Sequence, residues 1–277
     1  GLDSSAIAKL RARARRDVDD GLLPSCQWAL AMNGELVESE TYGDATDDTR
    51  YVVYSATKAF VAGAMWLLIG DGLVDISRRV ADYIPEFATN GKDVITVEQV
   101  MLHTSGFPSA PLAPLNGATS AGRRAAFAKW RTNWEPGTRF EYLPTAAHWV
   151  LAEIIEVDLP RPRTPDQLFS PRFTSPRSTS ERETSALTAF GDPAVQAVGV
   201  PGGGGVMRAR DLALYYQAIL HNPGELWDPR VLDDARTRVR NRLPDPFTGV
   251  PANRTLGLIR AAADGKDQYR GFGRSAH

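Results

Sequence analysis

This chain of 277 residues has almost no cysteine, and neither basic nor acidic side chains are in clear excess. Each of these absences excludes a class of protein. The single cysteine, Cys26, cannot form an internal disulfide, has no metal-ligand residues near it, and is typical of a small core residue on a strand. The 32 basic and 33 acidic side chains give a net charge of −1. Because nucleic-acid-binding proteins usually carry a basic surface, the sequence predicts no nucleic-acid partner.

The N-terminal part of the chain lacks a long apolar run. Residues 1–20 carry charges throughout, and no apolar stretch there leads to a small-residue cleavage site. We therefore expect neither a signal peptide nor a membrane-spanning segment in the given chain. A cytoplasmic location is the default expectation, with export left open.

The first part of the chain is predicted to form a helix followed by a hairpin. Apolar residues make up 43% of the chain, which is enough for a sizeable core. They recur at helical spacing over residues 4–20, which indicates an amphipathic helix. Strand-like runs at residues 26–32 and 35–42 flank Asn33-Gly34, a dipeptide that is favoured in two-residue hairpin turns.

The middle of the chain is predicted to be mostly helical. Residues 55–69 are apolar on nearly all sides, as in a buried helix. Thr96 and Gln99 form a capping-box pattern that begins a short helix. Two further helices are expected over residues 121–131 and 146–156.

The last part of the chain begins with an irregular stretch. Residues 157–185 hold five prolines and five arginines without apolar periodicity, which favours a long loop. A helix is expected over residues 211–221. Residues 255–259 and 268–272 flank Asp264-Gly265, which predicts a second hairpin.

Lysine is scarce, because only five of the basic side chains are Lys and the rest are Arg. One of the five, Lys58, lies three residues after Ser55 at the start of the apolar helix. This spacing places both side chains on one helical face, and a serine hydroxyl needs such a nearby base to act as a nucleophile. Apolar neighbours favour the neutral form of the amine. The alternative, a Lys58 that snorkels to the surface, is left open by the spacing alone.

Four segments of the chain carry a family resemblance, and they are Tyr54-Ser55-Ala56-Thr57-Lys58, residues 100–108, residues 136–142 and residues 203–212. In this order they resemble the motifs of class C serine β-lactamases, low-molecular-weight penicillin-binding proteins and their esterase relatives. The resemblance extends over about residues 20–220, so it involves far more than one tetrapeptide.

The resemblance implies a serine hydrolase that forms an acyl-enzyme without a cofactor or a metal. It implies Ser55 as the nucleophile, Lys58 as its base, and Tyr142 as a proton relay between Ser55, Lys58 and the leaving group. The alternative for Tyr142 is an aromatic core residue. The observation that would decide most is whether Lys58 and Tyr142 both lie within about 3.2 Å of Ser55 Oγ.

The resemblance also implies a fold of the α/β (α+β) class over residues 1–277, as a single β-lactamase/transpeptidase-like domain. Residues 1–80 and 190–277 are expected to form an α/β lobe, in which helices flank an antiparallel sheet. Residues 81–190 are expected to form an inserted, mostly helical lobe that includes the Pro- and Arg-rich loop. We expect the active-site cleft between the two lobes, with Ser55 at a helix N-terminus.

Two departures from the family pattern affect the predicted activity. The lactamases and transpeptidases carry Tyr-x-Asn, whereas this chain has Tyr142-Leu143-Pro144 and contains no Tyr-x-Asn or Ser-x-Asn anywhere. Loss of that amide favours esters over β-lactams. The third motif, His-x-Gly or Lys-Thr-Gly, is also absent, unless His277 begins one. Because its strand supplies an oxyanion amide, we expect the chain to be either a fragment that lacks its C-terminal part or a weak catalyst.

Other candidate residues are assigned structural roles. The family's histidine that matches His103 holds the loop around it, and we expect the same here. The glycine run at residues 202–205 lacks the Lys-Ser/Thr of a phosphate-binding loop, which favours a tight turn near the active site. His148 and His221 have no ligand spacing, so no metal site is predicted.

The predicted function is hydrolysis of a small-molecule ester or amide substrate, with carboxylesterase-like turnover of esters as the first expectation. The alternatives are β-lactamase or D-Ala-D-Ala-type peptidase activity, and a non-catalytic or weakly active module that binds penicillin, a peptide or a carbohydrate. We expect no cofactor, and the sequence does not specify an oligomeric state.

Overall fold

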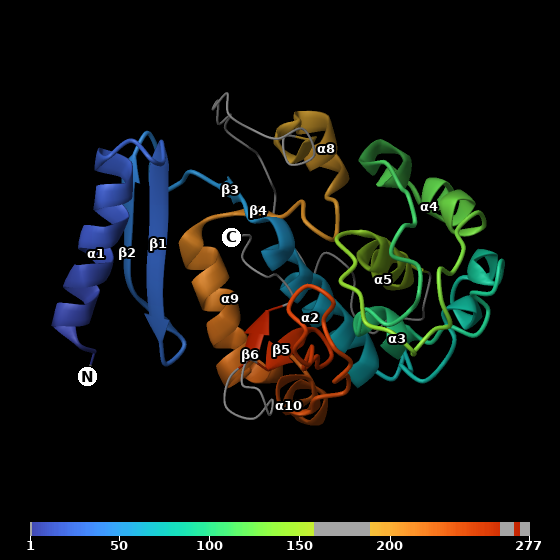
Figure 1. Ribbon diagram of the computed structural model, residues 1–277. Helices are drawn as coiled ribbons and strands as arrows, with labels where there is room; N and C mark the ends of the chain where they lie inside the picture. The colour runs from blue at the N-terminus through green and yellow to red at the C-terminus, as the bar shows by residue number, and fades with distance from the viewer. Residues whose placement is uncertain (1, 158–188, 261–268, 272–277) are drawn as a thin grey trace. The chain divides into compact units, whose positions relative to one another are not determined.

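The computed structural model describes residues 2–157, 189–260 and 269–271. They form two compact units. Figure 1 colours the chain from its N-terminus to its C-terminus, so the elements of each unit can be found by residue number. The first unit comprises residues 2–52 and 206–224, and the second comprises the other described residues. The two lobes expected from the sequence were defined by their helix and strand content, so their bounds differ from those of these units. The division into lobes remains a prediction.

A hairpin with a helix on each side forms most of the first unit. β1 (Ser25–Met32) pairs with β2 (Glu35–Gly43), and Asn33-Gly34 turns the chain with φ angles of 55° and 85°. Positive φ at both residues is the geometry for which Asn-Gly is favoured in hairpins. Helices α1 (Ser4–Asp19) and α9 (Ala209–His221) both contact the two strands, and Figure 1 shows them on opposite sides of the hairpin. The predicted first helix and hairpin are confirmed.

The described strands form three antiparallel pairs. Besides the hairpin, β3 (Tyr51–Val52) pairs with β4 (Val206–Met207) in the first unit. In the second unit β5 (Leu258–Arg260) pairs with β6 (Tyr269–Gly271), as the second predicted hairpin requires. The turn of that hairpin lies outside the described residues, as does the Pro- and Arg-rich loop after Val157.

Helix α2 (Thr57–Gly70) is the central buried helix of the second unit. Most of its 14 residues are buried, and α5 (Ala146–Glu156) and α10 (Pro229–Thr237) pack against it. The indole of Trp227 meets that of Trp66 edge to face at 5.6 Å and donates a hydrogen bond to an α2 carbonyl at 2.8 Å. A helix that is apolar on nearly all sides is stable only with such cover, so the prediction of a buried helix is confirmed.

The short helix α3 (Val97–Met101) begins with the predicted capping box. The backbone amide of Gln99 donates to Thr96 Oγ1 at 3.2 Å, and the amide of Thr96 donates to Gln99 Oε1 at 3.0 Å. Each side chain thus satisfies a backbone N–H that has no partner within the helix. The cap fixes the start of the segment that leads to His103.

Helix α4 (Ser120–Phe127) ends one turn earlier than the sequence predicts. The carbonyl of Ala128 accepts a hydrogen bond from Thr89 Oγ1 at 3.0 Å, and the carbonyl of Trp130 accepts one from Lys92 Nζ at 2.7 Å. In a longer helix the backbone N–H groups of later residues would bond these carbonyls. Here the side chains of Thr89 and Lys92 bond them instead. The apolar pattern could not reveal partners that lie far away in the sequence.

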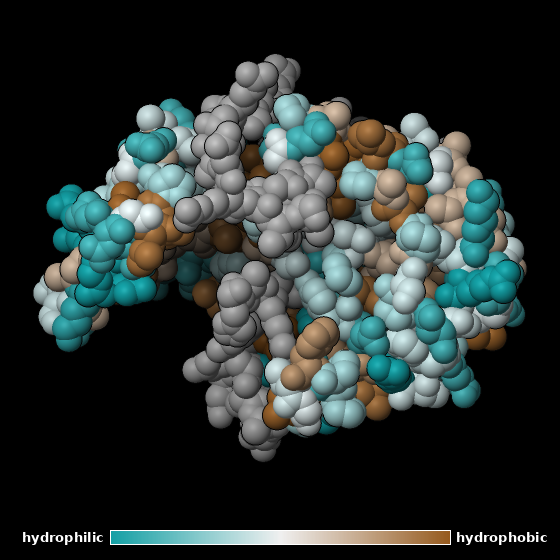
Figure 2. Space-filling view, turned by 45° about the horizontal axis from the view of Figure 1, so that its top comes forward, coloured by the Kyte–Doolittle hydropathy of each residue, from teal (hydrophilic) through white to brown (hydrophobic). Residues whose placement is uncertain are grey.

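Short helical segments connect the longer elements, and they are η2 (Val80–Asp82), η3 (Pro85–Phe87), η4 (Pro114–Ala118), η5 (Ala189–Gly191), α8 (Pro193–Val198) and η6 (Pro223–Glu225). Figure 2 shows apolar side chains interspersed with polar ones on the face that it presents. None of the helices in the described part of the chain combines the length and the apolarity needed to cross a bilayer.

Candidate active site

Ser55 lies in a single helical turn, η1 (Tyr54–Ala56), directly before α2. Tyr54 has a φ of 43°, a left-handed conformation that is uncommon for an aromatic residue and indicates strain in this turn. Thr57 Oγ1 donates to the carbonyl of Tyr54 at 2.5 Å and accepts from the amide of Gly205 at 2.8 Å. These bonds hold the serine in a defined orientation at the N-terminal end of a buried helix.

The three residues predicted to carry the chemistry lie together. Ser55 Oγ lies 3.1 Å from Lys58 Nζ and accepts a hydrogen bond from the Tyr142 hydroxyl at 2.7 Å. Lys58 reaches the serine because residues three apart share one face of a helix. Tyr142 comes from 87 residues further along the chain. The site therefore combines a hydroxyl, an amine and a phenol in one hydrogen-bonded cluster.

Lys58 is buried and does not snorkel to the surface, because none of its surface is exposed. Its Nζ donates to the carbonyl of Pro144 at 2.7 Å and to the carbonyl of Gly202. Burial, and second the positive charge of Arg254, lower the pKa of Lys58 from 10.5 to about 7. An amine with that pKa is partly neutral at neutral pH and can accept a proton.

The two carbonyls also orient the amine. A neutral amine has two hydrogens and one lone pair, so when Pro144 and Gly202 accept both hydrogens the lone pair is left for the Ser55 hydroxyl. A side chain at position 202 would disturb this arrangement, because a Cβ there would lie 2.5 Å from the Pro144 oxygen. The closeness of the Pro144 oxygen is therefore a steric reason for glycine at position 202, the first residue of the glycine turn predicted near the active site.

His103 holds the segment that carries Tyr142. The amide of Leu143 donates to His103 Nδ1 at 3.0 Å, and the imidazole lies 5.1 Å from the Tyr142 ring. Burial, with the charges of Arg254, His148 and Lys58, keeps the pKa of His103 well below its ordinary 6.5, so the ring is neutral and Nδ1 accepts. The structural role expected for His103 agrees with these contacts. Tyr142 is only partly buried, unlike a core aromatic residue.

Sequence reasoning misses Arg254, a buried arginine beside the cluster. Only 1% of its surface is exposed, and its guanidinium carbon lies 5.6 Å from the centre of the Tyr142 ring and 5.1 Å from that of Phe140. The chain contains many arginines, and no motif distinguishes this one. Its charge is nevertheless a cause of the lowered pKa values of both Lys58 and His103.

The described residues contain no group of three or more His, Cys, Asp or Glu side chains that could hold a metal. His148 is buried in α5 with its ring 5.7 Å from that of His103, and burial keeps its pKa well below the ordinary value. His221 lies at the C-terminal end of α9 in the first unit. At the cluster itself the described groups with reactive chemistry are the serine, the amine and the phenol.

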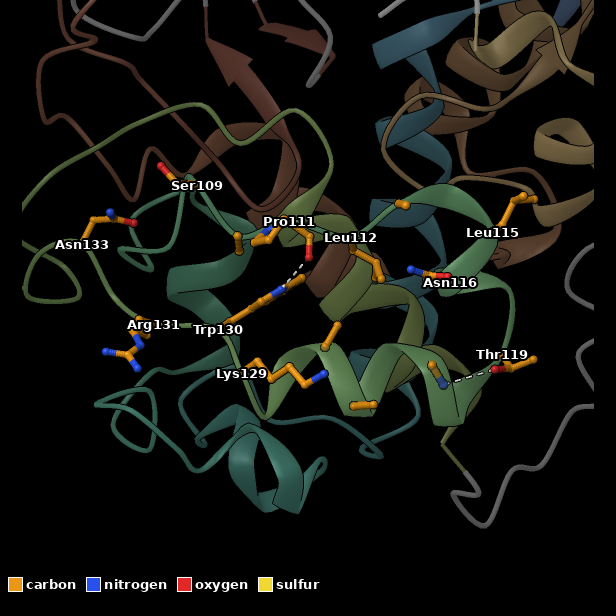
Figure 3. Close-up of a pocket in the computed structure, with 15 residues that line it drawn as sticks. Ser109, Pro111, Leu112, Leu115, Asn116, Thr119, Lys129, Trp130, Arg131 and Asn133 are labelled. Atoms are coloured by element: carbon orange, nitrogen blue, oxygen red, sulfur yellow. Dashed lines mark hydrogen bonds between the residues drawn. The ribbon is translucent and has the colours of Figure 1, made fainter.

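A separate cavity of about 970 Å³ lies in the second unit between the η4 segment and α4 (Figure 3). Its lining residues all fall between Ser109 and Asn133. The indole N–H of Trp130 donates to the carbonyl of Pro111 at 2.9 Å inside it. Because none of the cluster residues lines this cavity, it is a separate feature of the unit.

Comparisons with known proteins place the chain in a family. The sequence profile of the Beta-lactamase family matches residues 10–275. Over 72 residues the chain is 42% identical to "Esterase/beta-lactamase LipL" of Mycobacterium tuberculosis, a match that covers 26% of this chain and 16% of LipL. It is 28% identical over 142 residues to "Protein flp" of Staphylococcus aureus, covering 46% of this chain and 28% of that protein. The chain thus matches well under half the length of these curated relatives.

A crystal structure of a family VIII carboxylesterase has the same fold, with a TM-score of 0.72 and 24% sequence identity. The similarity covers 95% of this chain and 83% of the carboxylesterase. The profile match extends over nearly the whole chain, and the fold agrees with it. The chain therefore belongs to the Beta-lactamase family and has the β-lactamase fold.

Proposed function

We propose that this chain is a serine hydrolase that cleaves small-molecule esters through an acyl-enzyme on Ser55. The observation that carries the proposal is the position of Ser55 Oγ, which lies 3.1 Å from a buried lysine amine and 2.7 Å from a phenol hydroxyl. A serine hydroxyl becomes an effective nucleophile only when a base takes its proton. Lys58, with a pKa of about 7, is a suitable base at neutral pH.

The first half of the reaction forms the acyl-enzyme. Ser55 Oγ attacks the ester carbonyl carbon, a C–O bond forms, and the serine proton passes to the neutral amine of Lys58. Tyr142 then donates its proton to the departing alkoxide as the ester C–O bond breaks, and Lys58 returns a proton to the tyrosine. The contact of Ser55 Oγ with Lys58 Nζ makes the first transfer local, and the contact with Tyr142 puts the phenol beside the oxygen at which the ester reacts.

The second half releases the acid. A water molecule attacks the acyl carbonyl, gives a proton to the Tyr142–Lys58 pair, and the bond to Ser55 Oγ breaks with return of a proton to the serine. In both halves negative charge develops on the carbonyl oxygen. In this proposal the amide of Ser55, which precedes α2, stabilises that charge together with the helix dipole.

Two observations favour esters over β-lactams. Pro144 stands where lactamases carry the asparagine of the second motif, and proline offers no side-chain amide to hold a lactam or peptide carbonyl. Among the similar proteins, one curated relative is named an esterase/β-lactamase and one solved structure is a carboxylesterase. Hydrolysis of β-lactams or of D-amino-acid peptides, and binding without catalysis, are the competing outcomes of the test.

The experiment combines covalent labelling with turnover. The purified chain is treated with a fluorophosphonate probe and assayed with p-nitrophenyl butyrate, in parallel with a Ser55→Ala variant. We expect labelling of Ser55 and ester turnover in the first protein, and neither in a variant that keeps the same circular dichroism spectrum. Equal turnover in both proteins, or a folded protein that neither labels nor turns over ester, would overturn the proposal.

A further inference from the structure

The cavity between η4 and α4 has the size and the lining of a ligand site. Its volume is about 970 Å³, and ligand sites in proteins usually enclose about 300–1,000 Å³ behind mostly apolar walls. Figure 3 shows residues of the 109–116 segment on one side, α4 on the other and Trp130 between them. Alanine, proline and leucine side chains make up much of this lining.

Small residues on α4 leave the cavity open. Gly122, Ala125 and Ala126 line it, and their spacing places them on one face of the helix. At Gly122 the helix lies so close to η4 that a Cβ would be 2.0 Å from the main-chain oxygen of Asn116. The two alanines that follow are too short to fill the space beside them, so the cavity results from the packing of these two segments.

The wall formed by Trp130 is held in place on several sides. Its indole N–H donates to the carbonyl of Pro111 at 2.9 Å, and its own carbonyl accepts a hydrogen bond from Lys92 Nζ at 2.7 Å. Its ring lies 5.7 Å from that of Phe107 and 4.8 Å from that of Phe127. A wall that is already ordered lowers the entropy cost of binding a ligand.

The charged residues that line the cavity are all positive. They are Lys129 and Arg131, both exposed, and no Asp or Glu lines the cavity. Within the described part of the chain neither side chain forms an ion pair or a hydrogen bond. Figure 3 shows the Lys129 side chain extended along the face of α4. Apolar walls with unpaired positive charges beside them are complementary to a ligand that has an apolar chain and one anionic group.

We propose that this cavity binds a free carboxylate with an apolar chain of medium length, such as decanoate. The chain would lie against Ala125, Ala126 and the facing Leu112, with the carboxylate beside Lys129 and Arg131. The eight residues of α4 form a wall about 12 Å long, at 1.5 Å per residue, which suits a chain of this length. The inference does not depend on the proposed hydrolysis, because it involves no residue of the Ser55 cluster.

Isothermal titration calorimetry with decanoate, below the concentration at which it forms micelles, measures the binding. We expect one site per chain, with an affinity at least about tenfold higher than for hexanoate, because each methylene removed from water contributes up to about fourfold. Decyltrimethylammonium has the same chain with a positive head group and should bind at least about tenfold more weakly than decanoate. Equal affinity for decanoate and either of the other two compounds overturns the proposal.

Charge variants test the place of the carboxylate. Lys129→Gln and Arg131→Gln should each weaken decanoate binding about threefold, and the double variant about tenfold, which is the scale of exposed ion pairs. Lys9→Gln is the matched control, since Lys9 is an exposed lysine of α1 in the first unit, and it should leave the affinity unchanged. Unchanged affinity in the double variant overturns the proposal.

A size variant and a blocked catalytic serine test the place of the chain. Ala125→Leu fills part of the cavity and should weaken binding at least about tenfold, whereas Ala8→Leu on exposed α1 should not. Both alanines are exposed, so both variants should keep the circular dichroism spectrum of the unaltered chain. Modification of Ser55 by a fluorophosphonate should leave decanoate binding intact. Loss of binding on modification, or equal binding by the two leucine variants, overturns the proposal. If Ser55 is not labelled, only the proposed function fails, because the cavity variants still locate the ligand.

Discussion

The main-chain oxygen of Pro144 lies 2.7 Å from Lys58 Nζ, although the two residues are 86 positions apart in the sequence. Proline at this position removes the side-chain amide that lactamases of the family carry, but it leaves a carbonyl that accepts a hydrogen bond from the lysine. The contact with the lysine is thus provided by the backbone, while the amide that would face a substrate is lost. The backbone contact bears on the role of Lys58 as a base, and the loss of the side-chain amide bears on the choice between esters and β-lactams.

Activity should rise with pH through about 7, the pKa that burial and the charge of Arg254 give Lys58. The sign follows from the role of a base, because the protonated amine that predominates below this pH cannot accept the serine proton. Lys58→Arg should be nearly as damaging as Lys58→Ala, with a loss of about three orders of magnitude in kcat/KM, since a guanidinium stays protonated. The measurement is the pH profile of p-nitrophenyl butyrate hydrolysis.

A second buried lysine provides the control for that prediction. Lys92 is as buried as Lys58 and bonds the oxygens of Thr89 and Trp130, but it does not contact Ser55. Lys92→Arg should lower the melting temperature and leave kcat/KM of the folded protein within a few-fold of its original value. Retention of most activity in Lys58→Arg would remove Lys58 from the role of base.

Esters should be hydrolysed much faster than cephalosporins, because the chain lacks the amide that would grip a lactam carbonyl. We expect kcat/KM for p-nitrophenyl butyrate to exceed that for nitrocefin by about two orders of magnitude, the scale of one lost hydrogen-bond donor at a reacting centre. Ser55→Ala supplies the background rate for both substrates. A Pro144→Asn variant should shift the ratio toward nitrocefin, and efficient nitrocefin cleavage by the unaltered chain would contradict the prediction.

The sequence predicts the local parts of the site better than the distant ones. Ser55 and Lys58 are found by their spacing at the start of the apolar helix together with the family resemblance, and the capping box and the first hairpin are found by their local patterns. Tyr142 is found only through the family resemblance, because no local pattern connects it to Ser55. Such predictions are reliable where the interacting residues are near neighbours in the chain.

The remaining contacts of the site escape sequence analysis for a physical reason. The carbonyl of Gly202 that accepts a hydrogen bond from Lys58 belongs to the backbone, so the residue type at that position does not predict the contact. The two residues are also 144 positions apart in the sequence. Arg254 is one of many arginines, a residue type that is mostly exposed, so its burial is set by the tertiary fold alone. The end of α4 is likewise set by side chains of a distant loop.

Gly202→Ala should impair catalysis by moving the Lys58 amine. The added Cβ would lie 2.5 Å from the Pro144 oxygen and 2.8 Å from Thr145 Cα, so one of the two main-chain segments must shift. Misplacement of a catalytic group by about 1 Å costs on the order of 100-fold, and we expect a loss of that size in kcat/KM. Gly191→Ala is the matched control, since its Cβ meets nothing within 4 Å. Equal activity in the two variants would show that the turn tolerates a side chain.

Glu153 should be a main source of stability in the helical part of the second unit. Its carboxylate is buried and accepts hydrogen bonds from Ser120 Oγ at 2.6 Å, Arg123 Nε at 2.7 Å and Arg124 Nε at 2.6 Å. Burial acts to raise the pKa of Glu153, but the bonds from Ser120, Arg124 and Arg123 together keep it below 4.5. Its stabilisation is therefore present at neutral pH and is lost as pH falls below 4.5 and through the lowered pKa.

Glu153→Gln should reduce the free energy of unfolding at pH 7 by about 3 kcal/mol, because it removes the buried one of the two carboxylates that pair with the buried guanidinium of Arg123 and leaves only the exposed Glu156. Glu86→Gln is the control, since it removes a 43% exposed carboxylate from Arg124 and should cost less than about 1 kcal/mol. Urea unfolding followed by circular dichroism at pH 7 and pH 4 measures both. The difference between Glu153→Gln and the unaltered chain should shrink at the lower pH, where the glutamate of the unfolded chain binds a proton more readily than that of the folded chain. A difference that stays constant across this range would mean that Glu153 stabilises the fold through packing and not through its charge.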